Sequence, residues 1–256
     1  MDDITIKTEV RKHYAAVATQ GSCGCNSDCC SGAGEDIVRL IDYGDVDAEV
    51  VDGANLGLGC GLPTLYAGIQ PGHTVLDLGS GAGVDVFLSA KAVGPQGRVV
   101  GVDMTPEMIA RARENAAKGN YQNVEFRLGE IEHLPIDDDS VDVVISNCVI
   151  NLVPDKRRVY DEIWRVLRSP DAVTGKPGGR FSISDVVTYG QIPESIRGDI
   201  ALWTGCIAGA MDRDAYLQII HDAGFTHVTI DKFVEYDTLK GENYGVAGIT
   251  LEGQKV

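Results

Sequence analysis

The chain has 256 residues, a formal net charge of −16 at pH 7 and 44% hydrophobic residues. This length and hydrophobic content predict one large domain with a sizeable core and an appended segment. The negative charge argues against nucleic-acid phosphate or an anionic membrane surface as the partner. No apolar run approaches the roughly 20 residues of a membrane span, and the first residues lack an apolar signal core. We therefore expect a cytoplasmic protein.

Residues 4–18 carry apolar positions compatible with a short amphipathic helix. A Gly/Ser-rich stretch follows, whose composition predicts a flexible loop. It holds four of the seven cysteines of the chain: Cys23, Cys25, Cys29 and Cys30. In a reducing compartment such cysteines are thiols, metal ligands or catalytic groups before they are structural disulfides. Their spacing is not a zinc-finger pattern, so a thiol-bearing arm is favoured over a closed zinc site, with a dispensable tail as the alternative.

The apolar run at 74–78 predicts a buried strand, and residues 84–93 predict the helix that follows it. The turn between them carries Gly79, Gly81 and Gly83. Glycine lets the backbone turn tightly and approach a ligand closely. Ligands of open α/β sheets bind at the carboxyl ends of the strands, so this turn predicts a cofactor site. The pattern D-x-G-x-G-x-G differs from the dinucleotide-binding pattern in the position of its third glycine.

Residues 98–102 predict a second strand, which ends in Asp103. An acidic residue roughly 20 positions after the glycine turn is placed to accept hydrogen bonds from ribose hydroxyls. Asp77 and Asp103 thus bracket the turn at the ends of two neighbouring strands. Taken alone, the glycine turn is weak evidence for a nucleotide cofactor, since an ordinary tight turn of a doubly wound sheet has the same form. Together the two features resemble the class I S-adenosylmethionine (SAM)-dependent methyltransferases, whose first two motifs have this form.

Alternating strands and helices continue along the chain and then give way to a different pattern after residue 193. The elements expected are a helix at 108–117 after Thr105 as cap and Pro106 as first position, strands at 124–128, 141–145 and 180–187, a helix at 155–167, helices at 194–209 and 213–223, and antiparallel strands at 226–236 and 245–251. The predicted fold is therefore an α/β, Rossmann-like class I methyltransferase sheet with helices on both faces and a small C-terminal α+β cap domain. We expect an N-terminal helix and cysteine-rich arm at 1–60, the SAM-binding domain at 61–190 and the cap at 191–256.

The three remaining cysteines lie in informative places. Cys148 follows the strand at 141–145, whose end faces the same crevice as the glycine turn, so this thiol and Asn147 are candidate ligand contacts. Cys60 lies in a Gly-rich loop upstream of the first strand, and Cys206 lies on a predicted apolar helix. Taken singly, each of these cysteines is more often a small buried hydrophobic residue than a ligand.

Three segments make a closer resemblance, to the arsenite methyltransferases: SNCVINLVPDK at 146–156, GCG at 59–61 and W-x-x-C at 203–206. The resemblance implies that the substrate, arsenite or thiol-bound As(III), is held by Cys60, Cys148 and Cys206. As(III) is soft and prefers thiolates, and three sulfurs leave its lone pair free to attack the SAM methyl group. The resemblance further implies arsenite detoxification, reduction through a disulfide between Cys60 and a thiol of the arm, and thioredoxin or glutathione as the reductant that restores the thiols. Which thiol of the arm acts is open.

The resemblance also carries over the cofactor contacts: Asp77, Gly79, Gly81, Gly83, Asp103, Met104 and Asn147, with Glu130 and Ile131 around the adenine. One position departs from the pattern, since Gly205 stands where eukaryotic relatives have a glutamate. Two alternatives remain at this stage. One is a SAM-dependent methyltransferase acting on a quinone or another small organic acceptor, and the other is a thiol-based metal-sequestering protein on the same scaffold.

Overall fold

The protein is described by a computed structural model that covers residues 2–20, 53–56, 58–190, 209–236, 240–241 and 243–256. The four cysteines of the arm and Cys206 lie outside the described residues. The helix expected at 194–209 does so too, apart from its last residue. No helix in the described part of the chain is long and apolar enough to cross a membrane.

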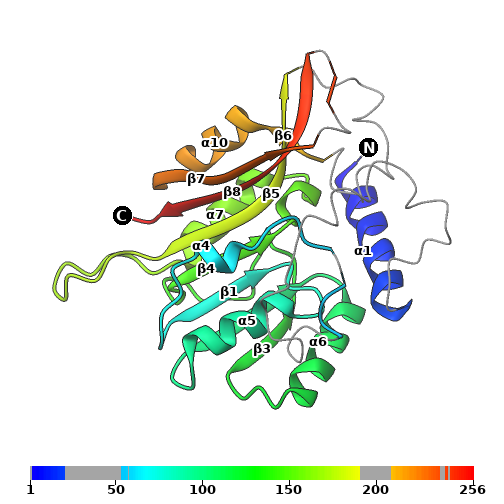
Figure 1. Cartoon of the computed structure of the whole chain (residues 1–256). Coiled ribbons are helices and arrows are strands. Elements are labelled where there is room, and N and C mark those ends of the chain that lie inside the picture. Colours follow the sequence, from blue (N-terminus) through cyan, green and yellow to red (C-terminus); the bar gives the residue numbers. More distant parts are fainter. Residues whose placement is uncertain (1, 21–52, 57, 191–208, 237–239, 242) are drawn as a thin grey trace.

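The apolar segments of the chain assemble into an eight-stranded sheet (Figure 1). Its strands are β1 (Thr74–Leu78), β2 (Arg98–Asp103), β3 (Val124–Leu128), β4 (Val143–Asn147), β5 (Arg180–Gly190), β6 (Met211–Asp212), β7 (Thr226–Glu235) and β8 (Tyr244–Gln254). They follow the order β3-β2-β1-β4-β5-β8-β7, with β6 beside β5. Strands β1 to β5 are parallel, and the strand order reverses between β1 and β4. Such a reversal opens a crevice at the carboxyl ends of the strands, which is where ligands bind in sheets of this kind.

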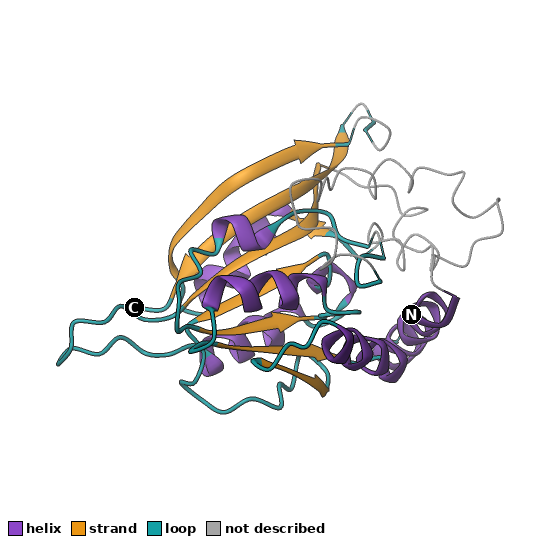
Figure 2. Ribbon diagram, turned by 60° about the horizontal axis from the view of Figure 1, so that its bottom comes forward, coloured by secondary structure: helices purple, strands orange, loops and turns teal. Residues whose placement is uncertain are grey.

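Helices cover both faces of the sheet, as Figure 2 shows. The helices are α1 (Asp3–Gln20), α4 (Pro63–Tyr66), α5 (Val84–Val93), α6 (Pro106–Lys118), α7 (Lys156–Val166), α10 (Arg213–Asp222) and the 3-10 helix η1 (Ile150–Leu152). Side chains alternate between the two faces of a strand, so β1, β2 and β4 contribute to two cores. One core holds Val75, Val99 and Val143 with residues of α5 and α6. The other holds Leu76, Val100 and Val144 with residues of α7 and α10.

The expected α/β sheet with helices on both faces is confirmed, and so are the antiparallel C-terminal strands. Strand β8 pairs antiparallel with β5 from Arg180 opposite Gln254 to Gly190 opposite Tyr244, and β7 pairs antiparallel with β8. The C-terminal strands therefore extend the same sheet as the strands of the N-terminal half. The division of the chain at residues 60 and 190 stays a prediction.

Most predicted boundaries agree with the structure to within a few residues, and the fourth strand shows how such a difference arises. Strand β4 begins at Val143, two residues later than expected, because Val141 pairs with Leu167 after α7 rather than with the sheet. At its other end β4 continues to Asn147, which pairs with Ser184 of β5.

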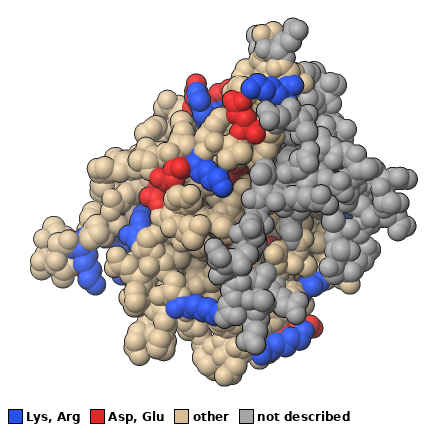
Figure 3. All heavy atoms as spheres, in the orientation of Figure 1, with Lys and Arg blue, Asp and Glu red and all other residues tan. Residues whose placement is uncertain are grey.

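The face shown in Figure 3 carries charged side chains of both signs. Basic and acidic residues lie scattered among other side chains there, with no large area of a single sign among the described residues. Several form ion pairs, such as Arg157 with Asp222 at 3.5 Å and Lys240 with Glu235 at 2.7 Å. Exposed pairs of this kind contribute about 0–1 kcal/mol each to stability, so burial of apolar side chains in the two cores stabilises the fold far more.

Candidate cofactor and thiol site

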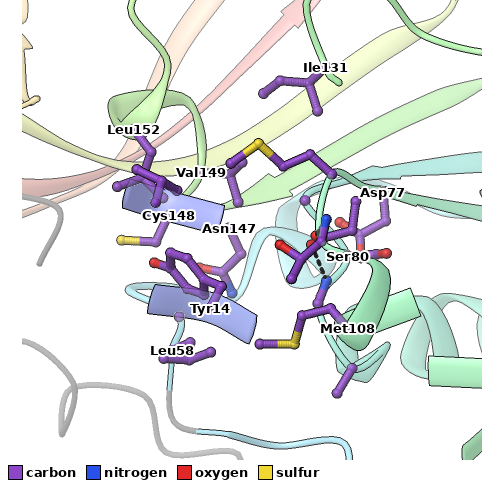
Figure 4. A pocket seen from close by; sticks show the side chains of 18 of the residues that line it. Tyr14, Leu58, Asp77, Ser80, Met108, Ile131, Asn147, Cys148, Val149 and Leu152 are labelled. Atoms are coloured by element: carbon purple, nitrogen blue, oxygen red, sulfur yellow. Dashed lines mark hydrogen bonds between the residues drawn. The ribbon is translucent and has the colours of Figure 1, made fainter. Parts of the chain in front are cut away.

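A cavity of about 1060 Å³, part of which is open to solvent, lies at the carboxyl ends of β1, β2 and β4 (Figure 4). Eight of the residues that the sequence marks as site residues line it: Asp77, Gly79, Gly81, Asp103, Met104, Ile131, Asn147 and Cys148. Three others lie beside it, each next in the chain to lining residues: Cys60, Gly83 and Glu130. The fold thus brings these separated segments of the chain to one cavity, as expected for residues at the carboxyl ends of parallel strands.

The three glycines of the turn have different roles. Gly81 has a φ of +51°, and a Cβ at this position would meet nothing within 4 Å, so its backbone faces open space. Gly79 has a φ of +66°, and a Cβ there would lie 2.4 Å from the side chain of Val149. Gly83 caps α5 with a φ of +99°, and a Cβ there would clash with Phe87. Gly81 is thus the glycine that leaves room for a ligand, whereas Gly83 is required for packing.

Asp103 fastens the glycine turn to the end of β2. Its carboxylate accepts hydrogen bonds from the backbone N–H of Gly81 at 3.0 Å and of Thr105 at 2.8 Å. Burial raises the pKa of Asp103, and these two N–H donors oppose that rise. The carboxylate is therefore held in place at the cavity wall, where a ligand with hydroxyl donors can reach it.

Two further carboxylates lie in the same wall. Burial, together with the charges of Asp85 and Asp103, raises the pKa of Asp77 well above its ordinary value. Burial raises the pKa of Asp85 to about 6, and a hydrogen bond from Asn147 opposes the rise. Asp85 Oδ1 is buried with no hydrogen-bond partner among the described residues, and so is Ser80 Oγ. Buried acceptors without partners are rare in native proteins, so this wall fits a ligand that brings donors and positive charge.

Asn147 ties the loop of Cys60 to the sheet. Its Oδ1 accepts hydrogen bonds from the backbone N–H of Cys60 at 3.0 Å and of Gly61 at 3.2 Å. Its Nδ2 donates to the carbonyl of Gly61 at 2.7 Å and to Asp85 Oδ2 at 3.1 Å. A Cβ on Gly61 would lie 2.4 Å from Ser184 Oγ, so the loop lies close against β5. The sequence marks Asn147 as a cofactor contact, and the structure adds this anchoring role.

Two of the three predicted arsenic ligands lie in one apolar cluster. Cys148 is buried in it, and Cys60 packs against it together with Tyr14 and Met104. Cys148 follows β4 with a φ of +61°, a backbone conformation uncommon for a residue other than glycine. Its N–H donates to the carbonyl of Ser184 at 2.8 Å. Among the described residues no group of three metal-ligating side chains occurs, and the third predicted ligand, Cys206, lies outside them.

Helix α1 lies over the cavity, a placement the sequence did not predict. Its residues Lys7, Val10 and Tyr14 are part of the cavity wall, and Figure 4 shows Tyr14 beside Cys148 and Asn147. Lys7 Nζ lies 2.6 Å from Glu130 and 2.8 Å from Glu132.

The hydrogen bond from Lys7 holds the pKa of Glu130 below its ordinary value. Glu130, expected near the adenine, is therefore engaged by α1, while Glu132 and Ile131 line the cavity. The amphipathic pattern of residues 4–18 predicts the helix, but it does not indicate which surface the helix covers.

The chain is similar to several known proteins. A family model described as a methyltransferase domain matches residues 69–224, more than half of the chain. An arsenite methyltransferase of Halobacterium salinarum is 51% identical over 86% of this chain and 57% of its own length. One of Aquipseudomonas alcaligenes is 41% identical over 66% of this chain and 48% of its own length.

The crystal structure of an arsenic(III) S-adenosylmethionine methyltransferase from Chlamydomonas reinhardtii is similar with a TM-score of 0.69. It is 35% identical and aligns over 88% of this chain and 74% of that one. The chain spans about half the length of the curated relatives it matches. These matches show that the chain belongs to the arsenite methyltransferase family within the class I SAM-dependent methyltransferases.

Proposed function

We propose that the protein methylates trivalent arsenic with SAM as the methyl donor. The observation that carries the proposal is the position of Cys148, which lines the cavity formed by the glycine turn and Asp103 and shares an apolar cluster with Cys60. A methyltransferase for a quinone or another organic acceptor has no use for two thiols at this point. The relatives described above are arsenite methyltransferases, and we propose the same activity for this whole protein.

The cavity wall fits SAM by its chemistry. SAM, when bound, supplies an electrophilic methyl group on a positively charged sulfur. The buried carboxylates of Asp77 and Asp85 suit a cationic ligand, and Asp103 suits ribose hydroxyls. The open backbone at Gly81 leaves room for close approach, and Met104 and Ile131 supply an apolar wall for the adenine. In the proposed site Asn147 and Glu130 act next to the cofactor, the first by anchoring the loop of Cys60 and the second by holding Lys7.

The arsenic is bound as a thiolate complex of Cys60, Cys148 and Cys206. Three sulfur ligands suit its softness and leave its lone pair directed away from them. The lone pair forms the As–C bond while the bond between the methyl group and the sulfonium sulfur breaks, and that electron pair stays on sulfur. The main contribution of the protein is to hold the reacting atoms about 3–3.5 Å apart in line. No general base is required, because arsenic has no proton to lose.

This step oxidises arsenic from +3 to +5, so two electrons must return. In the proposal a thiolate of the arm (Cys23, Cys25, Cys29 or Cys30) attacks the arsenic-bound sulfur of Cys60. A disulfide forms, the As–S bond breaks, and its electron pair stays on arsenic. Thioredoxin or glutathione then reduces the disulfide by thiol exchange. The chain has seven cysteines, so four thiols remain for this task beside the three proposed arsenic ligands.

The test is a methyl-transfer assay with labelled SAM, arsenite and a thiol reductant, with products separated by chromatography. The expected result is labelled methylarsenic, with one turnover and a Cys60 disulfide when the reductant is left out. SAM binding without labelled arsenic would contradict the proposal and direct the search to an organic acceptor. Arsenite binding without turnover would instead support a metal-sequestering protein.

A further inference from the structure

Behind Cys148 the structure contains a chain of buried polar side chains that the proposed reaction does not use. Asn151, Asp185, Tyr216 and Tyr160 are each at most 1% exposed, and they come from η1, β5, α10 and α7. Asp185 accepts hydrogen bonds from Asn151 Nδ2 and from the hydroxyl of Tyr216 at 2.9 Å. The hydroxyl of Tyr160 donates to that of Tyr216 at 3.0 Å. None of the four lines the cavity.

One end of this network reaches the thiol of Cys148. Asn151 Nδ2 lies 3.8 Å from Cys148 Sγ, within hydrogen-bonding range of sulfur. An amide nitrogen has two hydrogens, so Asn151 can donate one to Asp185 and the other to Sγ. The reverse orientation of the amide would place its oxygen against the carboxylate of Asp185, an acceptor against an acceptor, and is therefore disfavoured.

Two independent features show that this arrangement is not optimised for packing alone. Asn151 Oδ1 is buried and has no hydrogen-bond partner among the described residues, which is a cost to the folded state. The backbone of Cys148 is held in the left-handed region at a φ of +61°. Strained backbone and incompletely satisfied polar groups persist where the surrounding structure enforces them, often at functional sites.

We infer that Asn151, held by Asp185, is a positioning residue that orients the sulfur of Cys148 toward the substrate. This inference rests on the proposed function, since it concerns the orientation of an arsenic ligand. Asp185 holds the amide of Asn151 through one hydrogen bond, and that amide holds Sγ of Cys148 through another. Lys156 secures the same segment through the backbone, because its Nζ donates to the carbonyls of Asn151 at 3.1 Å and Val153 at 2.9 Å.

The experiment compares Asn151→Leu with Tyr216→Phe in the full chain. Asn151→Leu keeps the size of the side chain but removes both N–H donors. Tyr216→Phe is the matched control, because it removes one hydrogen bond to the same buried carboxylate and leaves the contact between Asn151 and Cys148 intact. Should Asn151→Leu fail to fold, Asn151→Ser replaces it, since its hydroxyl ends farther from Sγ. SAM affinity serves as the check of a folded site.

The readout is the number of sulfur neighbours of arsenic, measured by X-ray absorption on each protein loaded with arsenite, together with arsenite affinity. We expect three sulfurs in the unmodified protein and in Tyr216→Phe. In Asn151→Leu we expect two sulfurs and an oxygen, with about tenfold weaker arsenite binding, the size of one lost hydrogen bond. SAM affinity should stay within about twofold in both variants, a difference well below that of one hydrogen bond.

Equal results for Asn151→Leu and Tyr216→Phe would overturn the inference, because the network would then be merely structural. The proposed function would survive that outcome. If the unmodified protein bound no arsenite through sulfur, the proposed function itself would fail, and the inference with it. The two failures are thus distinguished by the unmodified protein alone.

Discussion

Asn147 offers the sharpest test of how the site is built. The change Asn147→Leu removes four hydrogen bonds, to the backbone of Cys60, to both backbone groups of Gly61 and to Asp85. At about 1 kcal/mol each, these bonds would contribute about 4 kcal/mol to the free energy of unfolding if water could not reach their partners. The cavity is partly open to solvent, so water replaces some of them, and we expect a loss of about 2 kcal/mol in the free energy of unfolding.

The functional consequence is expected mainly at the thiol. Without its anchor, the loop that carries Cys60 loses its fixed position, and arsenite affinity should fall by about tenfold or more, which corresponds to at least about 1.4 kcal/mol. SAM affinity should fall less. Urea denaturation measures the stability, and equilibrium dialysis with arsenite and calorimetry with SAM measure the two affinities.

A matched control is Asn123→Leu. Asn123 also donates its side-chain amide to two backbone carbonyls, those of Ala90 at 3.1 Å and Gly94 at 3.0 Å, but it is not a lining residue of the cavity. This change should reduce stability and leave both affinities unchanged. Weaker SAM binding by Asn147→Leu with unchanged arsenite binding would contradict this expectation, because Asn147 would then be a cofactor contact and not an anchor.

Three further predictions concern single side chains. Cys148→Ser should abolish arsenite methylation in the labelled-SAM assay and leave the calorimetric SAM affinity nearly unchanged, because the proposed cofactor contacts lie elsewhere; a parallel loss of SAM affinity would mark the residue as structural. Asp85 has a pKa raised from 3.8 to about 6 in the folded protein, so the folded state binds more protons and stability falls as pH rises from about 4 to 6. Asp85→Asn should therefore raise the free energy of unfolding at pH 7 by up to about 3 kcal/mol and flatten this pH dependence in urea titrations, and an unchanged dependence would contradict the assignment. Lys7→Met removes the ion pairs with Glu130 and Glu132, so the free energy of unfolding should fall by about 1 kcal/mol and protease should cleave α1 faster. A cleavage rate equal to that of the unmodified protein would show that these pairs do not hold α1 in place.

The local features of the fold could be predicted because each depends on the residue pattern of one short segment. The helix at 84–93 and the strand at 124–128 agree with the structure residue for residue. Hydrophobic periodicity and the glycines between elements are sufficient for this. The convergence of Gly81, Asp103 and Cys148 on one cavity followed from the strand-end rule for parallel sheets.

What could not be predicted depends on contacts between distant parts of the chain. The pairing of Lys7 with Glu130 joins residues 123 positions apart, and no local pattern contains it. The same holds for Asn151 and Asp185, which belong to different elements and meet only in the folded core. Asp85 had a signal, since it ends the motif DLGSGAGVD, but its buried and unpaired oxygen is visible only in three dimensions.

The adjacency of Asn147 and Cys148 at the end of β4 has a consequence for how this scaffold changes its chemistry. The side chain of Asn147 is directed to the loop of Cys60 and to α5, whereas Cys148 is connected to β5 and η1. Two successive positions at one strand end thus serve different neighbours: Asn147 joins the loop of Cys60 to Asp85, and Cys148 supplies a thiol of the proposed arsenic site. In that proposed site, a substitution at position 148 would change the group that meets the substrate and leave the anchor at Asn147 in place. Insertion or deletion of one residue within β4 would turn both side chains to the opposite faces and disrupt both sets of contacts at once.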